Sequence, residues 1–211
     1  MPIRRKDSEG EGIKPDFERR KYSRDFEGLI QQLESSVPME RRWAARDLSK
    51  YREASPYLAN RLRREEDLSV REVIVTSLLE IGDEVALKEL LECLRSDDAH
   101  LRNLAIDALK NVPEKVAPYI DMLLEDPDPD VRIFTVNIIG NLAHPRVIEW
   151  LVKVLEKDPH VNVCATALDV LSEIGTEDSL PVVIKVKERF KDEPYIQFVA
   201  NIVIERIKGN G

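Results

Sequence analysis

The chain has 211 residues, of which 43% are hydrophobic and 34% are charged, and its net charge is −8. No segment approaches the ~20 uninterrupted apolar residues that a membrane-spanning helix needs, which argues against an integral membrane protein. Two cysteines do not make a disulfide framework, and residues 1–10 lack the apolar core of a secretory signal. We therefore expect a cytoplasmic protein with reduced thiols.

The charge is unevenly distributed along the chain. Residues 1–71 hold 17 Lys and Arg against 14 Asp and Glu, whereas residues 72–211 hold 15 against 26. Binding along a phosphate backbone depends on basic side chains that release counterions. The acidic body therefore disfavours a protein that wraps nucleic acid along its length.

The first 22 residues are polar and show no periodicity. We predict a disordered tail or a lead-in helix over residues 1–22 and one repeat domain over residues 23–211. Ser23 can cap a first helix, which ends before Pro38. The apolar face of that helix carries Phe26, Leu29, Ile30 and Leu33.

From residue 40 onward one pattern occurs six times. We call its first residue the anchor, and the anchors are Glu40, Val70, Leu101, Val131, Val163 and Ile196, which lie 30 to 33 residues apart. The residues four, eight and eleven positions after each anchor are mostly apolar. These offsets fall on one stripe of an α-helix, and a fixed period of this length is typical of solenoids.

Each anchored segment is predicted to be the second helix, B, of a hairpin, and the segments between them supply the first helix, A. The A helices carry apolar residues at helical spacing, among them Leu58, Leu62, Leu90, Leu94, Ile120, Leu123, Leu151, Leu155, Val183 and Ile184. Gly82 and Gly175 directly follow their B helices, where a left-handed cap is expected. The predicted fold is an all-α solenoid of about six helical hairpins that forms a curved superhelix.

Three consecutive repeats share a further pair of charged residues. Asp67, Asp98 and Asp128 lie three residues before their anchors, and Arg71, Arg102 and Arg132 lie one residue after them. Each aspartate is expected to cap its helix. The three pairs are also expected to form an Asp–Arg ladder between neighbouring repeats.

The unit D-x-x-V-R-x-x-A-x-x-x-L-x-x-I-G, most complete in DLSVREVIVTSLLEIG at 67–82, resembles the HEAT repeat. More narrowly, it is similar to the short type found in phycobilisome lyase proteins and in many bacterial and archaeal scaffolds. The resemblance covers residues 23–208 and implies a solenoid whose B helices form the concave surface. Glu40, Cys164 and Gln197 depart from the pattern in repeats one, five and six.

No catalytic or metal-binding arrangement stands out. His100 and His160 lie two repeats apart, roughly 20 Å at 8–10 Å per packed layer. His144 falls at the opposite edge of its layer, so the three histidines cannot share a metal ion. The sequence has no glycine-rich phosphate loop, nucleophile elbow or paired-cysteine zinc pattern. We therefore expect no cofactor, no metal and no enzymatic activity.

A basic cluster lies in the first repeat and on the helix that follows it. It comprises Arg41, Arg42, Arg46, Lys50, Arg52, Arg61, Arg63 and Arg64. The cluster either docks an acidic partner or nucleic acid, or forms a solvated face paired with carboxylates such as Glu65. Trp43 lies among these arginines and can stack with one of them, whereas Trp150 is expected in the core.

The residues two, six and ten positions after each anchor point away from the predicted core. Along the array they change from basic to amide-rich and acidic, and at the far end they are apolar. Short amides and carboxylates lose little side-chain entropy on binding, and exposed apolar residues flanked by polar ones are typical of a partner site. The predicted partner-binding residues are Arg42, Arg46, Thr76, Asn103, Asp107, Ile133, Asn137, Asn141, Asp169, Phe198 and Ile202.

These features favour a non-enzymatic scaffold or adaptor that binds another protein or a peptide through the concave face. The alternative, a phycobilin-lyase-like or chaperone-like subunit that acts on a cofactor-bearing client protein, rests on the resemblance alone. A DNA-binding HEAT-like module is a third hypothesis. The acidic residues Glu72, Glu80 and Asp107 along the groove argue against that one.

Overall fold

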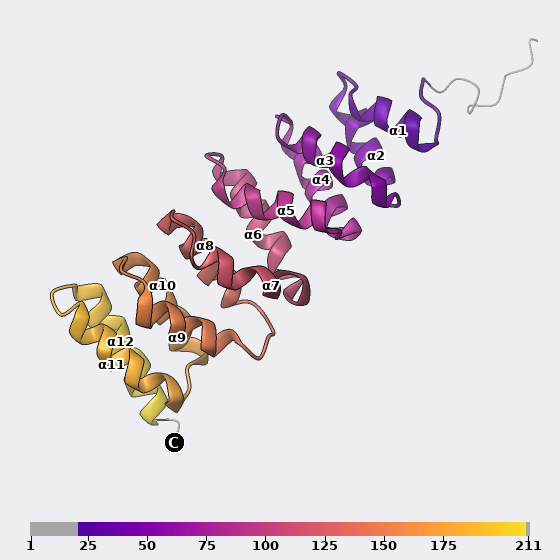
Figure 1. Cartoon of the computed structure of the whole chain (residues 1–211). Helices are drawn as coiled ribbons and strands as arrows, with labels where there is room; N and C mark the ends of the chain where they lie inside the picture. The colour runs from indigo at the N-terminus through magenta and orange to yellow at the C-terminus, as the bar shows by residue number, and fades with distance from the viewer. Residues whose placement is uncertain (1–20, 210–211) are drawn as a thin grey trace, which may run out of the picture.

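The computed structural model describes residues 21–209 and contains twelve α-helices in that range. The predicted tail over residues 1–22 lies almost entirely outside the described residues. The helices form six antiparallel hairpins, which follow one another along a line from the N-terminal to the C-terminal end (Figure 1). Within the described part of the chain, no helix is long and apolar enough to cross a membrane.

The hairpins have the phasing that the repeat predicts, with one A and one B helix in each. They are α1 (Phe26–Leu33) with α2 (Pro38–Leu48), α3 (Ser55–Leu62) with α4 (Leu68–Ile81), α5 (Glu84–Glu92) with α6 (Ala99–Lys110), α7 (Pro113–Leu123) with α8 (Pro129–Ile139), α9 (Val147–Lys157) with α10 (Val161–Ile174), and α11 (Leu180–Arg189) with α12 (Pro194–Gly209). Three short 3-10 turns, η2 (Arg52–Ala54), η3 (Cys93–Arg95) and η4 (Glu177–Ser179), adjoin A helices.

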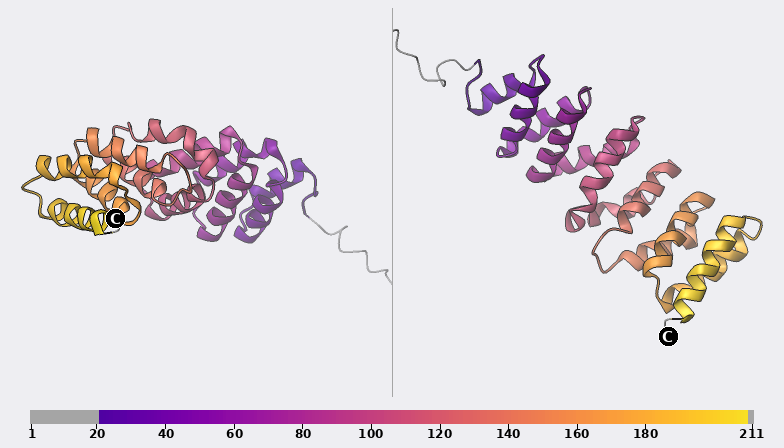
Figure 2. Two further views of the ribbon diagram at one scale, coloured as in Figure 1. Left: turned by 90° about the horizontal axis from the view of Figure 1, so that it is seen from below. Right: turned by 180° about the vertical axis from the view of Figure 1, so that it is seen from behind.

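The B helices stack in chain order, and each contacts the B helix of the next hairpin. One direct link is the Ser77 hydroxyl of α4, which donates to the Ala45 carbonyl of α2 at 2.9 Å. The ribbon seen from two further directions shows the same row of layers (Figure 2). The predicted all-α solenoid of six hairpins is therefore confirmed.

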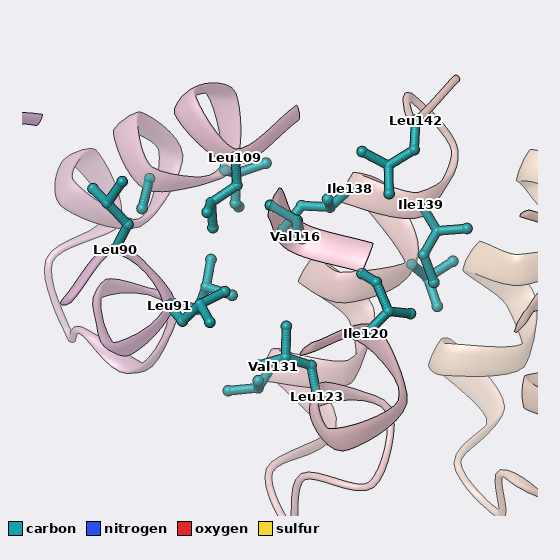
Figure 3. Packing of buried hydrophobic residues seen from close by; sticks show 14 of the residues in the cluster. Leu90, Leu91, Leu109, Val116, Ile120, Leu123, Val131, Ile138, Ile139 and Leu142 are labelled. Atoms are coloured by element: carbon teal, nitrogen blue, oxygen red, sulfur yellow. The ribbon is translucent and has the colours of Figure 1, made fainter. Parts of the chain in front are cut away.

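The core runs along the array between the A and B helices, as the repeating apolar stripe predicts. Figure 3 shows this packing around α5 to α8, where Leu109, Ile120 and Val131 are buried. Two residues expected in the core are exposed instead. Ile174 is the last residue of α10, and Ile184 lies on α11 in the last hairpin of the described range.

The caps agree with the sequence in most places. Asp67, Asp98 and Asp128 each accept a backbone N–H in the first turn of their B helices. Gly82 has a φ of 56° and closes α4 in the left-handed region. Gly175 was expected to do the same for α10, but its φ is −58° and its backbone is extended. The first helix is capped by Asp25, whereas the expected cap, Ser23, donates its hydroxyl to the Asp25 carboxylate.

Two layers approach closely at Gly140, the residue that follows α8. A Cβ at this position would lie 2.8 Å from a methyl carbon of Val170 on α10. This distance is shorter than normal carbon contacts, so the absence of a side chain sets how near the fourth and fifth hairpins come.

We call the segment between the A and B helices of a hairpin the A-to-B joint. The residue after the anchor stabilises this joint by hydrogen bonds to its backbone. The Arg41, Arg71, Arg102 and Arg132 guanidinium groups donate to the carbonyls of Ser35, Glu65, Ser96 and Asp126, at 2.5 to 2.9 Å. In every case the acceptor lies six residues earlier in the chain. In the fifth hairpin Cys164 replaces the arginine, and Arg189 of the following hairpin donates to the Asp158 carbonyl at 3.0 Å.

The same joints carry ion pairs that connect neighbouring hairpins. Arg71 pairs with Asp98 of the next layer, as the predicted ladder requires. Arg132 instead pairs with Asp158 at 2.7 Å, and Arg102 lies over the Phe134 ring at 5.6 Å. The ladder is therefore realised at one step, and other contacts replace it elsewhere.

Candidate partner-binding surface

The predicted partner-binding residues lie on one continuous surface formed by the six B helices. We call this surface the B-helix ridge and define it by positions 2, 6 and 10 after each anchor. Nine of the eleven predicted residues are exposed, and Ile133 and Asn137 are half-buried. The B helices that carry these positions contact one another in chain order, and Ala165, at position 2 of α10, is buried.

The middle of the ridge carries asparagine side chains that are oriented by their own helices. The Asn111 amide donates to the Asp107 carbonyl at 2.6 Å, and the Asn141 amide donates to the Asn137 carbonyl at 2.9 Å. Each bond holds the side chain on the helix surface while its amide oxygen can still accept a hydrogen bond. Thr76 is similarly occupied, because its hydroxyl donates to the Glu72 carbonyl.

The C-terminal end of the ridge is apolar. Phe198 is 62% exposed and Ile202 is 39% exposed on α12. Beside them Tyr195 is 55% exposed, and its hydroxyl donates to the Asp169 carboxylate at 2.9 Å, which raises the pKa of Tyr195. The sequence did not single out Tyr195, because it lies one residue before its anchor and outside the positions that define the ridge.

The basic cluster at the N-terminal end divides into two parts. Arg61, Arg63 and Arg64 on or after α3 are paired with Glu65, Glu89 and Glu34, and two of these partners belong to neighbouring hairpins. Arg63 and Arg64 are exposed and form the solvated, paired face that was one of the two alternatives, whereas Arg61 is 13% exposed and belongs to the buried joint. Arg42 and Arg46 on α2, and Lys50 in the turn that follows it, are ridge residues and are exposed.

Below the cluster, Glu65 is fully buried in the second A-to-B joint. Its carboxylate accepts from Arg41 at 2.6 and 2.7 Å and from Arg61 at 2.8 Å. Burial raises the pKa of Glu65, but the hydrogen bonds from the two arginines outweigh it and lower the pKa to about 2. Glu65 is therefore an ionised part of the framework and not a group that takes part in binding.

The remaining candidates for chemistry have structural positions. His144 stacks on the buried Trp150 ring at 4.9 Å. Burial raises the pKa of the Cys93 thiol to about 12 and that of Cys164 to about 11, which makes both thiols poor nucleophiles. Among the described residues, no group of three or more His, Cys, Asp or Glu side chains could hold a metal ion.

Comparison with known families and structures bears on the fold. Residues 26–110 and 116–198 match the family model for HEAT repeats. A comparison with curated proteins found no match.

Three solved structures illustrate the structural likeness. The complex of CpcE and CpcF of phycocyanin lyase from Nostoc sp. PCC7120 is 20% identical, with 97% of this chain and 99% of that chain covered and a TM-score of 0.37. An engineered protein is 23% identical, with 88% and 99% covered and a TM-score of 0.44. Human deoxyhypusine hydroxylase in complex with glycerol is 16% identical, with 87% and 84% covered and a TM-score of 0.44. Likeness at this level concerns the fold alone, so the lyase-like alternative stays a prediction.

Proposed function

Because the chain belongs to the HEAT-repeat family, we propose that it is a scaffold whose B-helix ridge binds a segment of another protein. The observation that carries this proposal is the composition of the ridge. Oriented amides occupy its middle, and exposed aromatic and aliphatic side chains occupy its C-terminal end. Amides can recognise a backbone, and apolar side chains can anchor it.

The spacing of the layers suits an extended partner. Packed helices lie about 8–10 Å apart, and an extended chain advances about 3.3 Å per residue. A bound segment would therefore pass one layer for about every three residues. Asn111 and Asn141 belong to consecutive hairpins. Their amide oxygens can therefore accept hydrogen bonds from backbone N–H groups of the same segment.

The charge of the ridge constrains the partner. Glu72, Glu80 and Asp107 lie on α4 and α6, and Asp169 and Glu173 lie on α10. A neutral or basic segment is favoured over this stretch, because a second row of carboxylates would be repelled. Phe198 and Ile202 would take an apolar side chain at the end of the segment.

Substitution of ridge residues tests the proposal. Affinity capture from native cells would compare the wild-type chain with Asn137→Arg and Phe198→Glu, which introduce bulk or charge on the ridge. Met122→Glu is the matched control, since Met122 is an exposed apolar residue (57% exposed) of the A helix α7. The proposal expects the same partners with wild type and Met122→Glu and their loss with both ridge variants. Partners that persist with both ridge variants would refute it.

A further inference from the structure

The two ends of the array can be compared, because each B helix has one side toward the preceding layer and one toward the following layer. Ser77, at position 7 of its helix, donates to the carbonyl of Ala45, at position 5 of the helix before. Arg102, at position 1, covers the ring of Phe134, at position 3 of the next B helix. Positions 3 and 7 therefore face backward along the array, and positions 1 and 5 face forward.

The last layer ends in polar residues on its forward side. At position 5 the first five B helices have Ala45, Val75, Ile106, Val136 and Leu168, all buried. The sixth has Asn201, which is exposed and accepts from the Lys187 ammonium at 2.7 Å. A polar outer face is what a terminal capping repeat requires.

The first layer keeps an aromatic residue on its backward side. Trp43 occupies position 3 of α2, the position that Phe134 has on α8. Phe134 is half-buried beneath Arg102, whereas Trp43 is 48% exposed and belongs to the first hairpin of the described range. Val37 and Met39, at the start of the same hairpin, are also exposed, by 46% and 59%.

Trp43 forms one wall of a pocket of about 450 Å³, which we call the Trp43 pocket. The segment that leads into α1 forms the opposite side. The lining residues are Lys21, Tyr22, Arg24, Gln32, Glu40, Trp43 and Arg46.

The charges around the pocket leave its solvent side positive. Among the described residues, Arg24 and Arg46 share a single carboxylate, that of Asp47, at 2.6 and 3.4 Å. The two arginine side chains are 59% and 67% exposed, whereas Asp47 is 16% exposed. Lys21 likewise is 66% exposed beside Glu40, which is 27% exposed. The acids are shielded and the cations face outward, so an incoming anion would meet positive charge.

We propose that the Trp43 pocket is a second binding site, for an acidic segment of a partner protein that carries an aromatic or aliphatic side chain. The apolar side chain would lie on the exposed indole, just as Arg102 of the preceding layer covers the ring at the same position of α8. A carboxylate beside it would complete the pairing of Arg24 and Arg46, which share one acid between them. The site shares only Arg46 with the B-helix ridge and does not depend on the amides or on Phe198.

Charge distribution favours an acidic protein segment over nucleic acid. A phosphate backbone that left the pocket along the ridge would next meet Glu72 and Glu80 on α4. Those carboxylates would repel it, and the favourable contacts would be limited to the first hairpin. A short acidic peptide fits within the basic hairpin.

Intrinsic fluorescence can report on this site directly. The chain has two tryptophans, and Trp150 is fully buried, so quenching of the emission by acrylamide reports on Trp43. The probe is a blocked peptide of sequence Glu-Glu-Phe-Glu-Glu, added to the full chain, with Lys-Lys-Phe-Lys-Lys and Glu-Glu-Ala-Glu-Glu as controls. The expected result is saturable protection of Trp43 by the first peptide, at least about tenfold tighter than by either control. The lysine peptide cannot make the charge-assisted hydrogen bond, which contributes about that factor, and the alanine peptide lacks the phenyl ring, whose burial contributes a similar amount.

Two variants make the test specific. Arg46→Glu should weaken binding of the acidic phenylalanine peptide by about tenfold or more, because it replaces an attractive charge with a repulsive one. Phe198→Glu should leave this binding unchanged, which separates the pocket from the ridge. The proposal is overturned if the peptide gives no protection or binds Arg46→Glu equally well. It is also overturned if a thymidine octamer protects Trp43 and the peptide does not, or if Trp43 is already as protected as Trp150 in the free chain.

Discussion

The A-to-B joints and the B-helix ridge use charged and polar residues of the same repeat in opposite ways. In the joints, carboxylates such as Glu65 and Asp158 are buried and each accepts from an arginine of the preceding hairpin. On the ridge, Asn103, Asp107 and Asn141 are exposed, and the contacts they make lie within one helix. Position within the repeat, more than residue type, therefore separates groups that stabilise the array from groups that can bind a partner.

The largest effect is expected from breaking the buried joint at Glu65. Glu65→Ala should lower the free energy of unfolding by about 3–5 kcal/mol, because it leaves Arg41 buried and without its carboxylate. Urea unfolding followed by circular dichroism measures this change. Glu66→Ala, at the exposed neighbouring residue, is the matched control and should change stability by less than about 0.5 kcal/mol. Equal effects of the two substitutions would contradict the assignment of Glu65 to the framework.

A related loss is expected when pH falls. The pKa of Glu65 is about 2 in the folded chain and 4.5 ordinarily, so its ionised form is favoured by folding. This contribution is complete above about pH 4.5 and is lost as the pH falls toward 2. The difference corresponds to about 3 kcal/mol at 1.36 kcal/mol per pKa unit. Between pH 5 and 2 the free energy of unfolding of Glu65→Gln should therefore fall less than that of the wild type, by up to about this amount. Equal pH dependence of the two free energies, measured by urea unfolding, would contradict this prediction.

A smaller loss is expected at the joint where the repeat lacks its arginine. Arg189→Ala removes one of two donors to the Asp158 carbonyl, the other being the Cys164 thiol at 3.4 Å, and should cost about 1–2 kcal/mol of unfolding free energy. Lys185→Ala, exposed on the same helix, should be nearly neutral. If Arg189→Ala is also neutral in urea unfolding, Cys164 alone suffices to hold this joint.

The smallest stability effect is expected on the ridge. Phe198→Glu should change the free energy of unfolding by less than about 0.5 kcal/mol, since the side chain is 62% exposed. Ile196→Ala, two residues earlier and fully buried, should cost about 2–5 kcal/mol in the same urea experiment. A large loss in Phe198→Glu would mean that Phe198 belongs to the packing of the last hairpin.

The hairpins and most caps could be predicted because their signals are local. The anchors and the residues four and eight positions later lie on one helix, and each capping aspartate lies three residues before its anchor. The buried carboxylates could not be predicted in the same way. Arg41 meets Glu65 across 24 residues and Arg132 meets Asp158 across 26, so their pairing depends on how two layers stack.

The candidate surface was predictable in outline for the same reason. Helical periodicity alone puts positions 2, 6 and 10 on the outside, and the structure arranges them in a continuous row. Tyr195 could not be found this way, because its contact to Asp169 joins residues 26 apart in neighbouring hairpins. The sequence shows Trp43 as an aromatic residue among arginines. Its exposure on the outer side of the first described hairpin becomes clear only when its position is compared with that of Phe134.

The close approach at Gly140 has a consequence for the geometry of the whole molecule. A methyl group added there would act as a wedge between α8 and α10, since it would meet Val170 at 2.8 Å. The last two hairpins would then move together relative to the fourth. Because Phe198 lies in the last hairpin, the absence of a side chain at Gly140 helps to set the distance between the amide and apolar parts of the ridge.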